Sequence, residues 1–395
     1  DILADSRYDR IVSIFSDQKV AVVGKAFPVC LVNGIEVASP RPGTGGFPGA
    51  DLGRRDLTVN AMAWEPVTGR FYDPFDGMSD LKNRRIRFTR DPDARIQEDP
   101  VRMVRACRFL ALINGAFETA SLSAAQKNAG LMDDGAAQER SRVEILKAMT
   151  LETPSLFFNA LRETGLLMRI FPSLDRCFDL DGGPHHGETV YDHCLLVGDA
   201  LPADRPLLRL AGYLHDTGKF DAADIKEGRL TFYHHEEQTG AMERDLSRLR
   251  FSNQEIKTLV SLTLAHMRPL GKETTPRAAR RLLAMLGELD LPWRDFLRMR
   301  LADRKGNRAR PAYTFAEIRE RVRPLKQELD RASALTEKDL AISGKTIMRL
   351  TGLAAGPRVG KIKKALLDQV LDDPGRNTPE TLEGLCLLLR DEMQS

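Results

Sequence analysis

The stretch "RRDLTVNAMA", residues 54–63, decides how the first part of this chain is interpreted. It places two guanidinium groups and a carboxylate beside a threonine and an asparagine, just where an apolar, helix-like segment begins. Arg54 and Arg55 can bind phosphate oxygens through their forked donors. Asp56 and Asn60 can hydrogen-bond to ribose hydroxyls or to a base. The stretch therefore predicts a nucleotide pocket, with the threonine and the apolar residues anchoring the segment at the entry to a helix.

The residues on either side of this stretch predict the fold class. Residues 19–43, "KVAVVGKAFPVCLVNGIEVASPRPG", contain three short apolar runs separated by Gly, Pro or Asn-Gly, which is typical of strands joined by hairpins. Residues 42–50, "PGTGGFPGA", predict a flexible loop. After Asp80 the apolar residues recur with helical spacing, and we expect no later strand-rich region. The prediction is an α+β chain, with a small N-terminal head built on a mixed sheet and a long all-helical remainder.

Composition limits the class of protein. The chain has 395 residues, which is too long for one compact core and predicts several domains. Apolar residues make up 42% and charged residues 29%, as in soluble globular proteins. Five widely spaced cysteines without a C-x-x-C pair favour a reduced, cytoplasmic protein over a disulfide framework. No apolar run is long enough to span a membrane, and we expect no membrane partner.

Positive charge is concentrated in one segment. The net charge of the whole chain is only 59 − 56 = +3, but residues 267–311 carry twelve Lys or Arg against five Asp or Glu, a local charge of +7. Such a segment is a candidate contact for a polyanion, and a solvated helical face is the alternative.

Two carboxylates of the expected sheet could hold a metal ion. Glu36 lies within an alternating apolar strand, and Asp1 directly precedes the apolar run "ILA". Acids on neighbouring strands can bind Mg²⁺, which completes its coordination shell with water and phosphate oxygens. A site of this kind suits phosphoryl or nucleotidyl transfer.

A second charged motif, "QEDPVRMVRACRF", begins a predicted helix at Asp99 and Pro100. At about 100° per residue, Arg102, Arg105 and Arg108 share one face of this helix. We expect that face to present its guanidinium groups beside Glu98 and Asp99, while the other face packs. Asp99 and Arg102 supply an acceptor and a forked donor that could pair with the Watson–Crick edge of a base.

These motifs, taken in order, resemble those of the class II tRNA nucleotidyltransferases, the CCA-adding enzymes. The quoted stretches that carry the resemblance are "RRDLTVNAMA", "YDPFDGMSDL", "IRF", "EDPVRMVRACRF" and "ERSRVEILKAM", and they are collinear with the family over most of residues 1–180. The resemblance implies a polymerase-β-like nucleotidyltransferase head and a neck that acts as a protein template for the added base. It also implies CTP, ATP and tRNA as partners and Mg²⁺ as the cofactor of the head.

The resemblance assigns roles to individual residues. By it, Asp1 is similar to the second acid of a D-x-D pair and Glu36 to a third carboxylate of the superfamily, both catalytic and metal-binding. The implied nucleotide-binding residues are Arg54, Arg55, Asp56, Thr58, Asn60, Glu98, Asp99, Arg102, Arg105 and Arg108. Asp73 and Asp80 fall in the motif that links the two groups, and Glu139, Arg140 and Glu144 in the neck motif, with Arg140 expected to contact RNA.

Two departures from the family pattern keep several functions open. Family members carry a glycine-rich turn and a first acid that the given sequence lacks, and we expect that residues of the real protein precede Asp1. The segment between Arg41 and Arg54 is also shorter than usual, and a loop there is associated with the switch from C to A addition, so a CC-adding enzyme is the alternative. The motifs are also compatible with an HD phosphohydrolase that has a non-catalytic RNA-binding head, and with a poly(A)-type polymerase.

All seven histidines lie between residues 185 and 266, which predicts a local role for them. Most of them sit beside apolar residues in helix-like runs, as inward-facing metal ligands do. Mixtures of imidazole and carboxylate accept Mn, Ni, Fe, Zn or Mg, so the identity of the metal stays open.

The order H…HD…H…H…D resembles the HD phosphohydrolase superfamily, and some bacterial tRNA nucleotidyltransferases carry such a domain. The implied ligands are His193, His215, Asp216, His235, His266 and Asp303. By this resemblance the metals activate water to attack a phosphoester, with cyclic phosphates or phosphomonoesters at RNA ends as substrates. Lys219 is expected either to contact phosphate or to cap a helix.

The C-terminal stretch "ISGKTIMRLTGLAAGPRVGKIKKALL" resembles a helix-hairpin tail that follows the tRNA backbone through Lys361, Lys363 and Lys364. An exposed basic helix without a partner is the alternative. The expected domains are a nucleotidyltransferase head (1–80), a helical neck (81–180), an HD domain (181–310) and a helical RNA-binding tail (311–395). The predicted function is protein-templated CCA addition to tRNA together with phosphoester hydrolysis by the HD domain.

Overall fold

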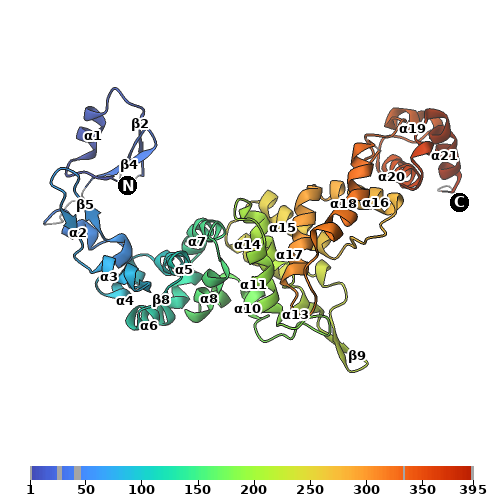
Figure 1. Cartoon of the computed structure of the whole chain (residues 1–395). Coiled ribbons are helices and arrows are strands. Elements are labelled where there is room, and N and C mark those ends of the chain that lie inside the picture. Colours follow the sequence, from blue (N-terminus) through green and yellow to red (C-terminus); the bar gives the residue numbers. More distant parts are fainter. Residues whose placement is uncertain (1, 25–28, 40–45, 332–333, 393–395) are drawn as a thin grey trace. The chain divides into compact units, whose positions relative to one another are not determined.

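The computed structural model describes residues 2–24, 29–39, 46–331 and 334–392. The chain divides into two compact units, Asp1–Ile170 and Phe171–Ser395, and Figure 1 shows the elements of each. Within the described ranges, every helix is too short or too polar to cross a lipid bilayer. All five cysteines are buried free thiols.

A small mixed sheet opens the first unit. Its strands are β1 (Ile2–Leu3), β2 (Val20–Val23), β3 (Val29–Val32) and β4 (Ile35–Ala38), in the order β1-β4-β3-β2. β1 runs parallel to β4, and β3 is antiparallel to both of its neighbours. Helix α1 (Tyr8–Ile14) covers the sheet, with Ile11 buried against Cys30, Val32 and Val37.

The turn between β3 and β4 confirms the hairpin that the sequence predicts. Asn33 and Gly34 have φ angles of 50° and 84°, a conformation that glycine and asparagine adopt at low cost. The turn sets a register in which Val32 pairs with Ile35 and Leu31 with Glu36. Side chains alternate between the two faces of a strand, so buried Val37 and exposed Glu36 point in opposite directions.

The rest of the first unit consists mostly of helices. Its elements are α2 (Gly49–Leu52), η1 (Thr58–Asn60), β5 (Ala63–Trp64), β6 (Phe71–Tyr72), α3 (Gly77–Lys82), β7 (Arg85–Ile86), α4 (Pro92–Glu98), α5 (Val101–Ile113), β8 (Ala116–Phe117), α6 (Thr119–Asn128), η2 (Ala129–Asp133), α7 (Gly135–Ala148), α8 (Ser155–Glu163) and α9 (Leu167–Ile170). Helix α5 is central because it packs against both α7 and α8. Its apolar side, including Met103, Val104 and Cys107, is fully buried.

The second unit is almost entirely helical. Its elements are α10 (Pro172–Asp175), α11 (Val190–Ala200), α12 (Pro206–Leu214), α13 (Lys219–Ala222), β9 (Asp224–Lys226), β10 (Arg229–Thr231), η3 (His235–Glu237), α14 (Gly240–Arg248), α15 (Asn253–His266), α16 (Pro276–Glu288), α17 (Trp293–Gly306), α18 (Phe315–Asp330), α19 (Gly344–Thr351), α20 (Pro357–Asp372), η4 (Pro374–Arg376) and α21 (Pro379–Glu392). Helix α11 packs against α12 and α17, and α12 against α15. Side chains from these four helices can therefore meet in one place.

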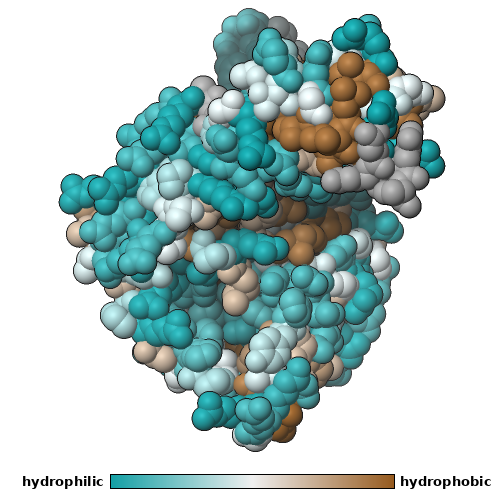
Figure 2. All heavy atoms as spheres, turned by 90° about the vertical axis from the view of Figure 1, so that its right-hand side faces the viewer, coloured by the Kyte–Doolittle hydropathy of each residue, from teal (hydrophilic) through white to brown (hydrophobic). Residues whose placement is uncertain are grey.

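The last helices form a core of their own in this unit. Ile347, Ile362, Leu366 and Leu382, from α19, α20 and α21, are among its buried members. Figure 2 looks onto the side where Figure 1 draws these helices and shows a largely hydrophilic face with a brown hydrophobic patch near its top. Leu388 of α21 is 63% exposed.

The predicted fold class is confirmed, because a small mixed sheet precedes a mainly helical chain. Several local details differ from the expectation. Residues 42–45 of the expected flexible loop lie outside the described residues, and its last residues, Gly49 and Ala50, begin helix α2. In the stretch 54–63, where we expected the entry to a helix, only Thr58–Asn60 form a single 3₁₀ turn (η1), and strand β5 begins at Ala63. The pairs β7–β8 and β9–β10 also lie beyond residue 80. The domain boundaries expected at 80, 180 and 310 stay predictions.

Candidate nucleotide pocket and metal centre

Asp56 organises the stretch 54–63. Its Oδ1 accepts hydrogen bonds from the Leu57 N–H at 2.8 Å and from Asn60 Nδ2 at 3.3 Å, and its Oδ2 accepts one from Arg105 Nη1 at 3.0 Å. The carboxylate is buried, so these bonds satisfy an otherwise costly charge. Three residues of the stretch 54–63 and one arginine of α5 therefore belong to a single hydrogen-bonded group.

Thr58 and Asp80 form a second hydrogen-bonded group that holds the η1 turn. The Thr58 hydroxyl donates to Asp80 Oδ2 at 2.7 Å, and Arg85 and Arg87 donate to the same carboxylate at 2.7 and 2.9 Å. Although burial opposes its charge, the bonds from Thr58, Arg87 and Arg85 lower the pKa of Asp80. Asp73 accepts from two backbone N–H groups at the start of α3. In this structure Thr58, Asp73 and Asp80 hold the turn in place.

The arginines of α5 are paired with carboxylates, and these include Glu144 as well as Glu98, beside which we expected the arginine face to lie. Arg102 Nη1 donates to Glu98 Oε2 at 2.8 Å, and Arg108 Nε donates to Glu144 Oε2 at 2.6 Å. Arg105 Nε also lies 3.7 Å from Glu144 Oε1. Helix α7 supplies Glu144, so the packing of α5 against α7 holds two of the three guanidinium groups.

Asp99 lies in extended backbone between α4 and α5, and α5 begins at Val101 with Pro100 as its N-cap, one residue later than predicted. The Asp99 Oδ1 accepts from the Val101 N–H at 3.1 Å and lies 2.9 Å from Arg140 Nη2. A base that hydrogen-bonds to Asp99 would therefore have to displace Arg140 from this carboxylate. Asp99 and Arg102 stay within one helical turn of each other, as the sequence predicts.

A pocket of about 440 Å³ opens beside these residues. Its lining residues are Gly53, Arg54, Arg90, Arg95 and Glu98. Arg54 and Glu98 were predicted from the sequence, whereas the other three were missed. A Cβ atom at Gly53 would meet the Arg90 guanidinium at 2.6 Å, so the glycine makes room for that cation. The three arginines in "RFTRDPDAR", residues 87–95, were the sequence signal that could have identified Arg90 and Arg95. Three guanidinium groups around one cavity suit a polyphosphate.

The other predicted residues of the first unit are spread over several elements. Glu36 is exposed on β4, and no described His, Cys, Asp or Glu joins it in a group tight enough for a metal ion. Asp1 lies outside the described residues, so the proposed head metal site is described only in part. Arg55 donates to the Asn60 carbonyl at 3.2 Å. Glu139 is exposed on α7.

In the second unit, four histidines share one arrangement. Each Nδ1 faces an acceptor: Glu188 Oε1 at 3.1 Å for His193, and the carbonyls of Gly212 at 2.8 Å for His215, of Phe232 at 2.9 Å for His235 and of Thr263 at 2.6 Å for His266. Acceptors of this kind fix the Nδ1–H tautomer and turn the Nε2 lone pair toward a metal.

All four Nε2 atoms point at Asp216. Its Oδ1 lies 3.1 Å from His235 Nε2 and 3.3 Å from His266 Nε2. Its Oδ2 lies 3.5 Å from His215 Nε2 and 3.6 Å from His193 Nε2. Asp216 is 2% exposed, and its carboxylate thus lies between two pairs of imidazoles in a buried space.

Asp303 completes the predicted set from helix α17. Its Oδ1 lies 3.2 Å from His193 Nε2, and Arg300 Nη1 donates to its Oδ2 at 2.7 Å. Lys219 Nζ lies 2.7 Å from Asp216 Oδ2 and is almost fully buried. All six ligands that the HD resemblance implies therefore lie in one cluster, while the exposed His234 lies outside it.

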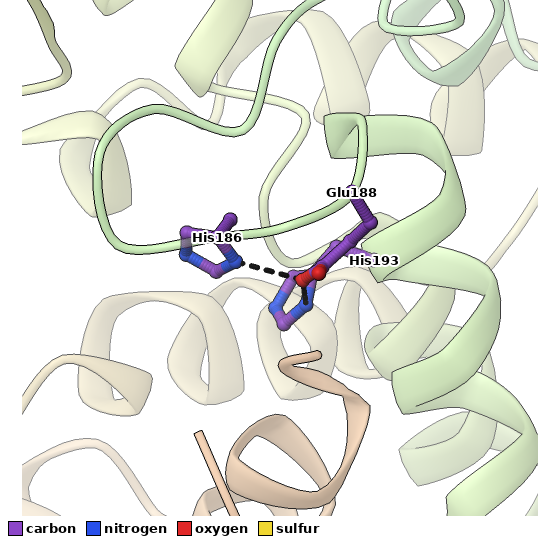
Figure 3. Close-up of side chains that lie close together, drawn as sticks. All are labelled: His186, Glu188 and His193. Carbon is purple, nitrogen blue, oxygen red and sulfur yellow. Dashed lines mark hydrogen bonds and ion pairs between the residues drawn. The ribbon is translucent and has the colours of Figure 1, made fainter. Parts of the chain in front are cut away.

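Glu188 and His186 belong to this cluster, and neither was predicted from the sequence. Figure 3 shows Glu188 between two imidazoles, with His186 Nδ1 at 3.0 Å and His193 Nδ1 at 3.1 Å from its Oε1. Its Oε2 accepts from the backbone N–H groups of Gly187 and Arg308, both at 3.0 Å. The spacing H-x-E shortly before His193 was the signal that could have found them.

The contacts within the cluster determine the protonation of its side chains. Although burial opposes its charge, hydrogen bonds with Asp303 and Glu188 raise the pKa of His193 to about 9. Burial lowers the pKa of His215 to about 3. Although burial opposes it as well, hydrogen bonds with His193 and His186 lower the pKa of Glu188 to about 2. The cluster thus holds a proton on His193 that a metal ion would have to displace.

The donor set fits a divalent metal. Two groups of side chains, His193–His215–Asp303 and His215–Asp216–His266, each place their ligand atoms within 4.8 Å of one another. His215 Nε2 is buried and has no hydrogen-bond partner among the described residues. A buried imidazole nitrogen without a partner is costly unless a metal binds it.

We expect Glu188→Gln to lower metal affinity by about 10- to 100-fold, the usual effect of losing an outer-shell partner. The amide is a weaker acceptor than the carboxylate and cannot hold both imidazoles equally well. Titration of the purified chain with Mn²⁺ or Ni²⁺ in a calorimeter would measure the change. Glu273→Gln, at an exposed position of the same unit outside every candidate metal group of the described residues, is the matched control, and equal affinities in the two variants would exclude this role for Glu188.

The three lysines predicted to bind RNA lie on α20. Lys361 and Lys364 are exposed and Lys363 is half-buried. Lys364 Nζ lies 3.9 Å from Glu288 Oε1 on α16. These positions leave at least Lys361 accessible to a polyanion.

Three family models match this chain. "Poly A polymerase head domain" matches residues 44–87, "Probable RNA and SrmB- binding site of polymerase A" matches residues 116–178, and "HD domain" matches residues 185–303. The A-adding tRNA nucleotidyltransferase of Deinococcus radiodurans is 33% identical over 340 residues, covering 80% of this chain and 74% of that protein. The chain belongs to the tRNA nucleotidyltransferases. The family membership predicted from the sequence motifs is therefore confirmed.

Two further comparisons cover different shares of the chain. The Multifunctional CCA protein of Methylococcus capsulatus is 40% identical over 179 residues, which is 43% of this chain and 41% of that protein. The crystal structure of the Bacillus stearothermophilus CCA-adding enzyme in complex with CTP matches the fold with a TM-score of 0.67 and 20% identity. This match covers 99% of the present chain and 88% of that one.

Proposed function

We propose that the first unit adds C and A residues from CTP and ATP to the 3′ end of tRNA, with Mg²⁺ as its cofactor. The observation that carries this proposal is the pocket of about 440 Å³ that Arg54 and Glu98 help to line. Asp99 follows Glu98 in the chain, and Arg102 is ion-paired with Glu98. Arg54, Arg90 and Arg95 would bind the triphosphate. The relatives named Multifunctional CCA protein, and the matching structures of CCA-adding enzymes in complex with CTP and with ATP, support this assignment.

In the proposed reaction the tRNA 3′ hydroxyl attacks the α-phosphorus, and pyrophosphate leaves. When bound, Mg²⁺ would align the hydroxyl and neutralise charge on the leaving group. Glu36 and Asp1 are the residues we propose to hold it. Asp99 and Arg102 would hydrogen-bond to the base edge after giving up Arg140 and Glu98, and Asp56 and Asn60 would orient the ribose. Thr58 would act only by supporting the turn.

A second candidate is addition of A alone. It is favoured by the Deinococcus radiodurans relative, which is named an A-adding enzyme and matches four fifths of this chain. Incorporation from CTP alone, ATP alone and both together separates the possibilities on tRNAs that end before, within and after the two C residues. C followed by A supports the main proposal, and A only after CC supports the second. C without A supports a CC-adding enzyme, and unlimited A addition would support a poly(A)-type polymerase.

For the second unit we propose metal-dependent hydrolysis of phosphoesters at RNA ends or in nucleotides. When bound, a divalent metal supplies polarisation of a phosphoryl oxygen and lowers the pKa of water. His193, His215, Asp216, His235, His266 and Asp303 are the proposed ligands. Glu188 would orient His193, and Lys219 would balance the charge of Asp216. The identity of the metal is left to assays with Mn²⁺, Ni²⁺, Fe²⁺, Zn²⁺ and Mg²⁺ in turn.

Turnover of 2′,3′-cyclic nucleotides and phosphomonoesters with each metal tests this second proposal. No turnover with any of the metals would reject it and leave the cluster with a structural role. Hydrolysis without nucleotide incorporation would instead support an HD phosphohydrolase with a non-catalytic head. We further propose that Arg140 and the α20 lysines contact tRNA, which charge reversal at Lys361 would test through the salt dependence of tRNA binding.

A further inference from the structure

A surface of arginines and aromatic rings lies directly after the last proposed metal ligand. Residues 304–323 carry seven Lys or Arg against two Glu, a local charge of 7 − 2 = +5. They form the end of α17, a loop and the first turns of α18. Arg308 and Arg310 are exposed, and Phe315 is 79% exposed. We call Arg304, Arg308, Arg310, Tyr313, Phe315, Arg319 and Arg321 the arginine–aromatic surface.

Both aromatic rings of this surface contact guanidinium groups. The Tyr313 ring lies between two guanidinium groups, with the Arg304 Cζ 4.9 Å and the Arg321 Cζ 4.2 Å from its centroid. The Arg319 Cζ lies 5.8 Å from the Phe315 centroid. Cation–π contacts keep such rings in place without burying them. A preformed, exposed ring costs little entropy when a flat partner stacks on it.

The loop of this surface is fastened to the metal centre. The Arg308 N–H donates to Glu188 Oε2 at 3.0 Å, and the other oxygen of that carboxylate faces His193. Asn307 Nδ2 donates to the His185 carbonyl at 3.0 Å. Arg304 directly follows Asp303 in the chain. A ligand lying along the surface would therefore reach the rim of the metal centre.

The cations of the loop are available for a new partner. Among the described residues, no carboxylate lies within ion-pair distance of Arg308 or Arg310, although ion pairs are common elsewhere in the unit. Unpaired guanidinium groups next to exposed rings are complementary to a ligand that has both phosphates and flat bases.

We infer that the arginine–aromatic surface binds a single-stranded RNA 3′ end and leads it into the metal centre of the second unit. Arg308 and Arg310 contact phosphates, and Phe315 stacks on a base. The inference rests on the proposed hydrolysis, because it names the substrate class of the same centre as RNA ends rather than free nucleotides. A folded duplex would offer phosphates but no base face to Phe315.

Photo-crosslinking tests this surface without requiring hydrolysis. The probe is a single-stranded RNA of about 10 nucleotides carrying 4-thiouridine, within the usual size of one binding site. Irradiation of the full-length chain with this RNA, followed by mass spectrometry, should find crosslinked peptides from residues 307–321. Arg308→Glu combined with Arg310→Glu should remove those crosslinks and lower the log–log salt slope of binding by roughly 0.7 per lost phosphate contact.

Kinetics supply the second readout. Phe315→Ala should raise the KM for an RNA ending in a 2′,3′-cyclic phosphate about 5- to 150-fold more than the KM for a 2′,3′-cyclic mononucleotide, the range expected for one stacked base. The ring is exposed, so the melting temperature of the variant should match that of the parent chain. Arg244→Glu, at an exposed position on α14 of the same unit, is the control for a charge reversal outside this surface, to be compared with Arg308→Glu and Arg310→Glu made singly.

The two proposals fail in different ways. Crosslinks at residues 307–321 without hydrolysis of any substrate would support the surface and reject the hydrolytic function. Crosslinks elsewhere in the chain but none in this segment would overturn the surface, whether or not the centre hydrolyses phosphoesters. Equal crosslinking by a duplex RNA of the same length would also overturn it, since it would show that base stacking plays no part.

Discussion

With Glu98, Asp99 and Arg102 all replaced by alanine, nucleotide incorporation into a tRNA that lacks its 3′ end should fall at least about 100-fold in kcat/KM. In the proposed complex, Asp99 and Arg102 each make a hydrogen bond between a charged group and the base, worth about 1.5–3 kcal/mol. Losing two of them therefore removes roughly 3 kcal/mol or more of transition-state stabilisation. Single-turnover incorporation from CTP and from ATP would measure the loss for each base.

The control for this experiment is Lys127→Ala, which breaks another ion pair in the same unit. Lys127 Nζ lies 3.2 Å from Asp93 Oδ2 on α4, the helix that ends at Glu98. This change disturbs the charge of α4 without touching the pocket, so incorporation should stay close to the parent value. Because the triple variant also loses the Glu98–Arg102 and Asp99–Arg140 pairs, its melting temperature must be compared as well. A folded triple variant with unchanged base selection would contradict the proposed role.

The parts of the fold that local sequence determines were predicted correctly. The Asn33-Gly34 turn, the strands beside it and the amphipathic helix α5 depend on residues close together in the chain. The 54–63 stretch was predicted less well. Its conformation depends on Asp80 and Arg105, which are respectively 22 residues from Thr58 and 49 residues from Asp56 in sequence. No local pattern reports such partners.

The same distinction applies to the two candidate sites. The order of histidines and aspartates was enough to name six residues, including Asp216, that the structure brings together in one cluster. By contrast, the pairing of Arg105 and Arg108 with Glu144 could not be derived from their helical spacing, because it depends on how α5 packs against α7. Glu188 was missed because a single acid in a loop has no periodicity, and only the fold places it between two imidazoles.

Asp216→Asn should reduce phosphoester hydrolysis by the second unit at least about 100-fold. Loss of an outer-shell partner already costs about 10- to 100-fold, and Asp216 lies among all four proposed imidazole ligands, with its oxygens 3.1–3.6 Å from their Nε2 atoms. The amide at position 216 would be a neutral and therefore weaker metal ligand. Its NH₂ group would also donate a hydrogen bond to an imidazole Nε2 atom, which would compete with metal binding. Initial rates on a 2′,3′-cyclic nucleotide, in the metal that best supports the parent chain, would measure the loss.

A second variant separates lost chemistry from lost folding. Asp216→Asn leaves the buried Lys219 ammonium, 2.7 Å away in the parent chain, without its counter-charge. Breaking a buried pair in this way typically costs about 3–5 kcal/mol. Adding Lys219→Met removes the stranded charge and should restore stability without restoring hydrolysis, because the ligand is still missing. Nucleotide incorporation by the first unit serves as an internal measure of intact protein in both variants. If Asp216→Asn hydrolysed the substrate at nearly the parent rate, the cluster around Asp216 could not be the hydrolytic centre.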